Sequence, residues 1–332
     1  MSQCPTHVAL RLLALLFLLP AAWSATFTMT NNCGYTVWPG LLSGAGTAPL
    51  STTGFALAHG ASATVDAPAS WSGRMWARTL CAEDATGKFT CATGDFGSGG
   101  IQCNGGYPAP PRKLMEFTLD GSGGMDFFDV SLVDGYNLPM IIVPQGGGAA
   151  APAGSGGGSG GKCMATGCLV DLNGACPADL RVMAASTGTG AAAPGGGPVA
   201  CRSACEAFGS PQYCCSGAYG NPNTCRPSTY SQFFKNACPR AYSYAYDDST
   251  STFTCTAGTN YAITFCPSTT SGKYSGGENP QAAGVPSTND TMVVLGAEQL
   301  STASSAAAHA APQLTLPLLP LVVVAALVAA MI

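Results

Sequence analysis

Alternating apolar and polar residues recur along the first part of the chain and predict short β-strands. The alternation is clearest at 73–80, 114–120 and 127–133, and a period of two places successive side chains on opposite faces of a strand. Residues 26–40 have a hairpin pattern, because a turn-like Asn-Asn-Cys-Gly separates two strand-like runs. Strands therefore dominate the chain as far as about Val143.

The second part of the chain combines short helices with two further strands. Helical spacing covers 201–208 and 228–237, and Ser228 is positioned as the N-cap of the second helix. Strand-like alternation returns at 251–254 and 260–265. This order predicts a mainly β protein with a helical insertion before its last strands.

Composition fits a loop-rich protein built from short strands. The 332 residues include 43 glycines and 24 prolines, and only 9% of residues are charged. Residues 145–161 and 184–200 are almost wholly Gly, Ala, Ser and Pro. They predict flexible loops, because such segments bury too little apolar surface to offset the entropy of ordering. The net charge of −4 and the lack of a basic run argue against a nucleic-acid partner.

The N-terminus has the pattern of a secretory signal peptide. An apolar run at 8–19 is followed by Ala22-Trp23-Ser24, a small-x-small cleavage site. Residues 1–24 are therefore the predicted signal, and the mature chain begins at Ala25. Secretion implies an oxidising compartment, in which the remaining 15 of 16 cysteines should be mostly paired. Since 15 is odd, one thiol is left over within a monomer.

The C-terminus has the pattern of a GPI-attachment signal. Residues 314–332 are apolar and uncharged, and no Lys or Arg follows Lys273, so the basic flank of a spanning helix is missing. This interpretation, which we favour over a retained helix, divides the end of the chain into a flexible linker (268–305), an attachment site at Ser304 and a removed signal (306–332). It predicts a chain on the outer face of the plasma membrane or in the apoplast, with Asn289 as a candidate glycosylation site.

Five cysteines lie within residues 201–225 and predict a disulfide scaffold. Cys214 and Cys215 are adjacent, and neighbouring Cα atoms lie closer than disulfide geometry prefers. Each is therefore expected to pair elsewhere, which would join this stretch to two partners.

Few residues are available for acid–base, metal or cofactor chemistry. His59 is the one histidine between the two terminal signals, and it lies in a Gly/Ala context without a catalytic motif. Disulfide-bonded cysteines do not bind metals, so neither a metal site nor a cofactor is predicted. Carboxylates remain: Glu116 and Asp129 lie on the polar faces of their strands, and Asp134 follows at a turn. On spacing alone, solvated surface charges would be the simpler explanation.

Several long motifs resemble the thaumatin-like family, the plant pathogenesis-related group 5 proteins. They are NNCGYTVWPG (31–40), GRMWART (73–79), GKFTCATGDFGSGGIQC (87–103), DVSLVDGYNLPM (129–140), QYCC (212–215), YSQFFKNACPRAYSYAYDD (230–248) and NYAITFCP (260–267). The resemblance covers 25–267. It implies a mainly β fold: a flattened β-sandwich (25–79, 113–169 and 239–267), a disulfide-rich helical domain (170–238) and a small disulfide loop domain (80–112).

The family pattern also implies the disulfides. They are Cys33–Cys266, Cys81–Cys91, Cys163–Cys255, Cys168–Cys238, Cys176–Cys201, Cys205–Cys214 and Cys215–Cys225. One position departs, because Phe96 occupies the place of a family cysteine whose partner would be Cys103. Losing so short a loop closure costs about 2–3 kcal/mol. We expect a looser 96–103 loop, with Cys103 either free or bonded to a second chain of an otherwise monomeric protein.

The resemblance further implies an acidic cleft between sandwich and helical domain. Its expected residues are Arg74, Glu116, Asp129, Asp134 and Asp247, with Asp248 as the alternative to the last. A defence protein with this cleft would bind β-1,3-glucan or a related wall polysaccharide, with an antifungal or stress-protective outcome. A weak endo-β-1,3-glucanase is the first alternative, with Glu116 as proton donor and Asp134 or Asp129 as base or nucleophile. The second is an anchored ectodomain of a signalling complex, in which the flexible inserts contact partners.

Overall fold

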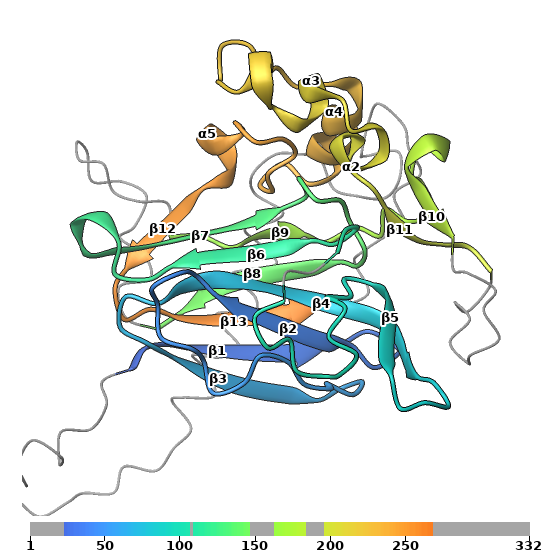
Figure 1. The fold of residues 1–332 in the computed structure, drawn as a ribbon. Coiled ribbons are helices and arrows are strands. Elements are labelled where there is room, and N and C mark those ends of the chain that lie inside the picture. Colours follow the sequence, from blue (N-terminus) through green and yellow to red (C-terminus); the bar gives the residue numbers. More distant parts are fainter. Residues whose placement is uncertain (1–22, 107–108, 147–162, 184–195, 268–332) are drawn as a thin grey trace, which may run out of the picture.

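The strands form two main sheets that pack face to face. The computed structural model describes residues 23–106, 109–146, 163–183 and 196–267. One sheet has five strands in the order β3-β1-β13-β8-β9, and the other has six, in the order β12-β7-β6-β4-β2 with β5 paired to β4 (Figure 1). The five-stranded sheet consists of β1 (Trp23–Asn31), β3 (Ser62–Pro68), β8 (Met140–Gln145), β9 (Thr166–Cys168) and β13 (Asn260–Phe265). The six-stranded sheet consists of β2 (Trp38–Ser43), β4 (Ser72–Glu83), β5 (Phe89–Thr93), β6 (Leu114–Thr118), β7 (Met125–Ser131) and β12 (Phe253–Thr256).

An aromatic cluster fills the space between the two sheets. Phe27 of β1 contacts Phe117 of β6 with ring centroids 4.7 Å apart, and Tyr261 of β13 lies 5.2 Å from the same ring. The Tyr261 hydroxyl donates to the buried carboxyl of Asp126 at 2.8 Å. One face of the six-stranded sheet is therefore buried in the core, and its opposite face is available to form a functional site.

The predicted side-chain alternation is confirmed on β6 and β7. Met115 and Phe117 are buried in the core, as are Phe128 and Val130. Glu116, between the two β6 residues, lies on the opposite face and is partly exposed. The pattern predicted these faces because apolar residues at every second position can be buried together only on one side of a strand.

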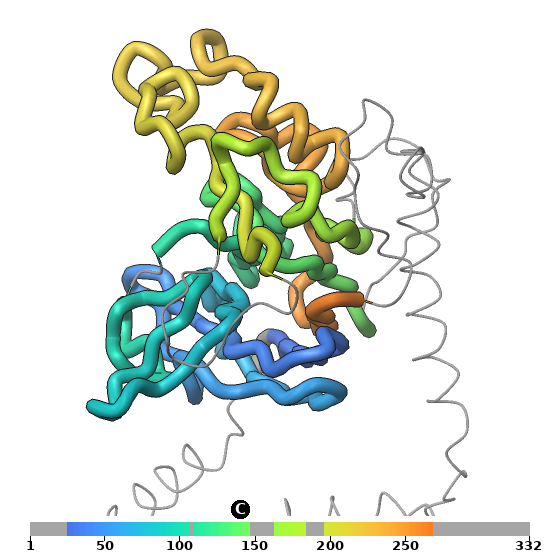
Figure 2. The backbone as a smooth tube through the Cα atoms, turned by 90° about the vertical axis from the view of Figure 1, so that its right-hand side faces the viewer, coloured from blue at the N-terminus to red at the C-terminus, as the bar shows by residue number. Residues whose placement is uncertain are grey.

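The helical region lies above the sandwich (Figures 1 and 2). Its helices are α2 (Ala204–Phe208), α3 (Pro211–Cys214), α4 (Thr229–Ala237) and the 3-10 turns η2 (Ala178–Leu180) and η3 (Gly217–Tyr219), and its strands are β10 (Arg181–Met183) and β11 (Pro198–Cys201). The predicted helix at 228–237 is confirmed, since the Ser228 side chain accepts from the Ser231 N–H and caps α4. Two short elements outside this region are η1 (Ser122–Gly124) and α5 (Asp248–Ser251).

Three predicted boundaries are wrong. The helix expected at 201–208 begins only at Ala204, because Cys201 pairs with Arg181 in a two-stranded sheet. The loop expected at 184–200 is also too long at its C-terminal end, since β11 begins at Pro198 and the residues that follow it in this strand are buried. The strand expected at 251–254 begins two residues later, after the α5 turn.

Seven disulfides cross-link the described residues, and they are the seven pairs that the family resemblance implies. They join Cys33–Cys266, Cys81–Cys91, Cys163–Cys255, Cys168–Cys238, Cys176–Cys201, Cys205–Cys214 and Cys215–Cys225. Cys214 and Cys215 therefore bind different partners, as their adjacency requires.

The predicted signal and anchor segments lie almost wholly outside the described residues. β1 begins at Trp23, two residues before the predicted mature N-terminus, and Ala25 pairs with Ala67 of β3. Asn289, Ser304 and the apolar 314–332 segment are not among the described residues. Among the residues that are described, no helix has the length and apolar character needed to cross a bilayer.

Candidate functional site: an acidic groove on the six-stranded sheet

A row of side chains crosses four neighbouring strands on the solvent-facing side of the six-stranded sheet. Leu42 of β2 is directly opposite Arg74 of β4, Arg74 is opposite Glu116 of β6, and Glu116 is opposite Asp129 of β7. Residues directly opposed in an antiparallel pair project to the same face, with Cβ atoms about 4.5–5.5 Å apart. Strand register alone therefore brings together three of the expected cleft residues, although they are far apart in sequence.

The Arg74–Glu116 pair is an ion pair at the centre of this row. The Arg74 Nε donates to Glu116 Oε1 at 2.5 Å, and the side chains are 43% and 34% exposed. At that exposure water screens the pair, so its main effect is to orient the carboxylate rather than to stabilise the fold. Glu116 Oε1 is thus fixed toward Arg74.

Asp129 lies in a different environment from Glu116, although the two are neighbours. Asp129 is half-buried, and its Oδ2 is shielded from solvent and has no hydrogen-bond partner among the described residues. Burial raises the pKa of the Asp129 carboxyl well above its usual range, and Glu116 and Asp248 raise it further against the opposing effect of Arg74. The adjacent carboxyls therefore differ: one is held by a cation and the other retains its proton to higher pH.

Asp134 is held by a buried arginine at the end of the row. Arg112 is 1% exposed, and its Nη2 lies 2.9 Å from Asp134 Oδ2. The same two residues are also joined through their backbones, since the Arg112 N–H donates to the Asp134 carbonyl at 3.0 Å. One oxygen of Asp134 is consequently engaged in the structure, and the carboxylate is fixed in orientation.

Asp247 does not contribute to the groove; its neighbour Asp248 does. Asp247 is 8% exposed, and its Oδ2 lies 2.8 Å from Lys235 Nζ and accepts from the N–H and hydroxyl of Ser243. Asp248 Oδ1 instead accepts from the Tyr242 hydroxyl at 2.7 Å, and both of these residues line the groove. The expectation of Asp247 in the cleft is therefore corrected to Asp248, because α5 turns the two side chains in different directions.

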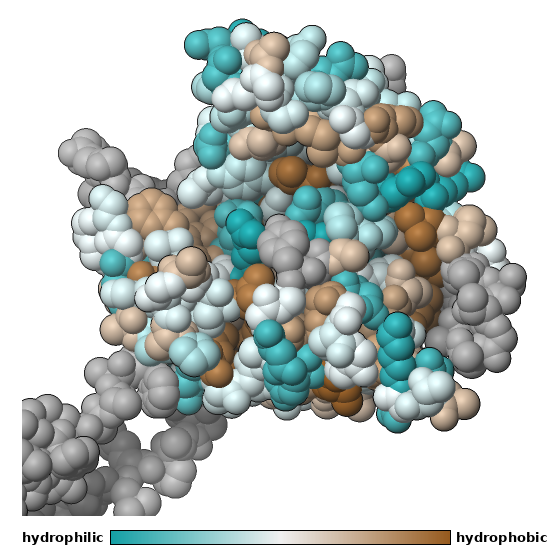
Figure 3. Space-filling model, viewed as in Figure 1, coloured by the Kyte–Doolittle hydropathy of each residue, from teal (hydrophilic) through white to brown (hydrophobic). Residues whose placement is uncertain are grey.

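The groove itself has a volume of about 410 Å³, within the range typical of small-molecule sites. It is lined by Arg74, Leu114, Glu116, Asp129, Ser131, Val133, Asp134, Tyr242, Ala245 and Asp248. Hydrophilic residues gather at the level where the helical region meets the sheets (Figure 3). Four carboxylates, one arginine and one tyrosine therefore surround an open space.

Three groups at the site were not predicted from the sequence. Tyr242 reaches the groove because its segment forms a parallel bridge with Ser131, which extends the sheet beyond β7. Arg112 has no strand periodicity that would identify it. Glu206 on α2 has a buried Oε2 without a partner among the described residues, and burial, with Asp134 nearby, raises its pKa to about 7 against the effects of Arg202 and Arg112. Glu206 thus places a proton-binding group beside the Arg112–Asp134 pair.

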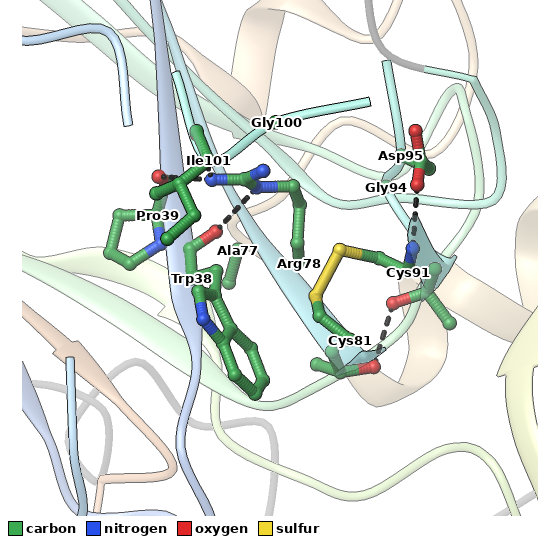
Figure 4. The surroundings of a disulfide bond; sticks show 12 residues. Trp38, Pro39, Ala77, Arg78, Cys81, Cys91, Gly94, Asp95, Gly100 and Ile101 are labelled. Atoms are coloured by element: carbon green, nitrogen blue, oxygen red, sulfur yellow. Dashed lines mark hydrogen bonds between the residues drawn. A yellow bond between two sulfur atoms is a disulfide. The ribbon is translucent and has the colours of Figure 1, made fainter. Parts of the chain in front are cut away.

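The 96–103 loop, where the resemblance implies a cysteine at the position of Phe96, is held by other contacts. The buried Arg78 guanidinium donates to the carbonyls of Trp38 and Ile101 at 2.9 and 2.7 Å, beside the Cys81–Cys91 disulfide (Figure 4). Phe96 lies against Arg78, with the guanidinium 4.5 Å from the ring centroid. These contacts join the loop to β2 and β4 without a second disulfide.

Cys103 is the one unpaired cysteine among the described residues, and it is 1% exposed. It lies in a small apolar cluster with Trp76 and Leu114, against which Phe96 packs. Burial raises the pKa of its thiol to about 12. The prediction that Cys103 has no partner within the chain is confirmed among the described residues, and the alternative of a bond to a second chain stays a prediction.

His59 is exposed on a loop, and its Nδ1 lies 2.7 Å from the Cys33 carbonyl. His59 is not among the residues that line the groove. Among the described residues, no group of three or more His, Cys, Asp or Glu side chains is arranged to hold a metal ion.

A two-sheet, disulfide-rich sandwich with a carboxylate-lined groove under a helical region defines the class of protein. The Thaumatin family matches residues 31–267, and the chain belongs to that family. It is 51% identical to Thaumatin-like protein 1 of Arabidopsis thaliana over 276 residues, 79% of this chain and 96% of the relative. The expected fold class is thereby confirmed.

Two further relatives differ in what their names describe. The chain is 50% identical to a protein of Prunus avium named glucan endo-1,3-beta-glucosidase, over 74% of this chain and 92% of the relative. It is 47% identical to the PR5-like receptor kinase of Arabidopsis thaliana, over 76% of this chain but 35% of that longer protein. Related domains therefore occur both alone and as part of a larger receptor.

Proposed function

We propose that this protein is a secreted, cell-surface defence protein that binds β-1,3-glucan or a related wall polysaccharide in the acidic groove. The observation that supports this most directly is the row of Arg74, Glu116 and Asp129, continued by Tyr242 and Asp248, along an open groove. Ionised carboxylates accept hydrogen bonds from sugar hydroxyls, and arginine and protonated carboxyl groups donate to them. The groove thus offers both donors and acceptors to a neutral, hydroxyl-rich ligand.

Binding is tested by titrating the purified protein with soluble β-1,3-glucan in a calorimeter. Glu116→Gln removes a charged acceptor from the centre of the row, and hydrogen bonds to charged groups contribute enough for a loss of at least about tenfold in affinity. Glu83→Gln is the matched control, because Glu83 is exposed at the far end of β4, outside the groove. Equal affinity of Glu116→Gln and wild-type protein would show that the ligand binds elsewhere.

A weak endo-β-1,3-glucanase is the second candidate, and the contrast between Asp129 and Glu116 favours it. General acid catalysis needs a carboxyl that keeps its proton, beside one that is ionised. Burial raises the pKa of the Asp129 carboxyl well above its usual range, and Glu116 forms an ion pair with Arg74, which supports Asp129 as the proton donor. This differs from the sequence-based assignment, which made Glu116 the donor with Asp134 or Asp129 as base or nucleophile. Direct opposition of the two residues also suits the carboxyl separation of about 5–5.5 Å found in retaining glycosidases.

Release of reducing ends from laminarin separates the two candidates. An enzyme loses this release in both Asp129→Asn and Glu116→Gln, whereas a binding protein releases no sugar in any form. Absence of both binding and release would favour the anchored ectodomain of a signalling complex, consistent with a relative named as a receptor kinase.

The GPI anchor is part of the proposal and rests on the sequence of the C-terminal region. The uncharged 314–332 segment and the small residues around Ser304 support it. Treatment of intact cells with phosphatidylinositol-specific phospholipase C should release the protein, and Ser304→Trp should reduce its surface display. Retention on phospholipase-treated cells that release other GPI-anchored proteins would contradict the anchor.

A further inference from the structure

A second hollow adjoins the acidic groove on the same face of the sheet. It has a volume of about 370 Å³ and shares Arg74 and Glu116 with the groove described above. Its other lining residues come from β2, β4, β6 and the turn after β2 and include Leu42, Gly44, Ser72 and Thr118. The Arg74–Glu116 ion pair is therefore the boundary between two sections of one depression.

Strand register explains why the two sections are continuous. Ser72 is opposite Thr118, and these residues are two positions along β4 and β6 from Arg74 and Glu116. They project to the same face, so the row of Ser72 and Thr118 lies beside the charged row at the spacing of one pleat. A chain molecule lying across the ion pair would contact both rows.

The second section differs from the first in charge. Arg74 and Glu116 are its only charged lining residues, and they already form an ion pair. Ser72 and Thr118 line the section, and their hydroxyls can both donate to and accept from a ligand. The section therefore suits a neutral polyhydroxylated chain. A charged group on the ligand would find both charged side chains of the section already engaged with each other.

The wall of the second section is fixed in place by backbone contacts. The Gly44 N–H donates to the Ser72 carbonyl at 2.7 Å, and the Thr47 hydroxyl donates to the carbonyls of Gly44 and Ser72 at 2.9 and 3.1 Å. The turn after β2 is thus joined to β4 before any ligand binds. A preformed site costs little ordering entropy on binding.

We propose that the second section is an additional subsite that binds further units of an uncharged polysaccharide, continuing from the acidic groove across the Arg74–Glu116 ion pair. This inference rests on the proposed function, since it names how the same ligand is extended. It requires affinity to rise with the length of the oligosaccharide until both sections are filled.

The test measures the affinity of purified protein for β-1,3-linked gluco-oligosaccharides of two to six units. Wild-type protein is expected to bind the hexamer at least about tenfold more tightly than the trimer. Thr118→Leu removes a hydroxyl and adds bulk, so the hexamer should lose about three- to tenfold, the range of one or two neutral hydrogen bonds. Thr254→Leu is the matched control, because Thr254 is a strand threonine of β12 that lines neither section.

Ser72→Val provides a second variant on a different strand, should Thr118→Leu alter the sheet. The inference holds if both variants lower hexamer affinity and leave trimer affinity within about twofold of wild type. Equal affinity of wild-type protein for trimer and hexamer would overturn the subsite while leaving the proposed function intact. Failure of every oligosaccharide to bind would overturn both.

Discussion

Phe96 stands where the family motif predicts a cysteine, and its ring should supply much of the stability that a disulfide at this position would give. The Phe96 ring contacts Trp76 with centroids 6.1 Å apart and lies under the Arg78 guanidinium at 4.5 Å. An aromatic pair contributes about 0.5–1.5 kcal/mol, a partly desolvated cation–π contact about 1–2 kcal/mol, and the half-buried ring adds a hydrophobic contribution. These contacts are not fully additive, so we expect Phe96→Ala to destabilise the loop by about 2–3 kcal/mol.

Cys103 reports this change directly, because its thiol is buried beneath the same loop. A thiol reagent labels it only when the loop opens, and 2–3 kcal/mol raises the open population and the labelling rate about 30- to 150-fold. Mass spectrometry at neutral pH follows the rate. Phe208→Ala is the control, because Phe208 is an exposed ring on α2. An unchanged labelling rate in Phe96→Ala would refute the idea that this ring closes the loop.

Three further predictions concern charge and capping in the helical region. Lys235→Met leaves the Asp247 carboxylate buried without its cation, so the free energy of unfolding should fall by about 3–5 kcal/mol in a denaturant titration; a loss below about 1 kcal/mol would contradict this. The pKa of Glu206 in the folded protein is raised to about 7, so ionisation of its carboxyl opposes folding. The free energy of unfolding therefore falls as the pH rises from the pKa of Glu206 in the unfolded chain through 7. Glu206→Gln should therefore raise the melting temperature at pH 8 but not at pH 4, and an equal gain at both would refute the assignment. Ser228→Ala removes the side chain that caps α4 and should cost about 1 kcal/mol; if Ser228→Asp, which keeps a capping oxygen, is equally destabilised, the cap is not the cause.

The sequence predicted the parts of the site that depend on strand periodicity. Glu116 and Asp129 alternate with apolar neighbours, so their face followed from the period of two, and register then placed them opposite each other. The motif resemblance predicted Arg74, which lies 42 residues before Glu116 in the sequence. Local pattern and family motif therefore agreed for the central row.

The rest of the site depends on contacts that a local pattern does not contain. Asp247 and Asp248 are adjacent, and which of them faces the groove is decided by the turn of α5 and by the Lys235 ammonium group. Arg112 is buried despite its charge because it forms an ion pair with Asp134. This contact forms only when two segments of the folded chain meet, so the local sequence does not predict it. Glu206 reaches the same place from a separate helix. Such long-range polar contacts require the tertiary arrangement.

The central position of β13 in the five-stranded sheet has a consequence for biosynthesis. The last strand among the described residues, β13, pairs in parallel with β1 on one side and antiparallel with β8 on the other, and Cys266 forms a disulfide with Cys33. Until residues 260–265 have emerged, β1 and β8 present unpaired edges that can associate with other chains. Synthesis must therefore reach residues 260–265 before the sandwich can close, and chaperones that cover the two open edges until then would raise the yield of folded protein.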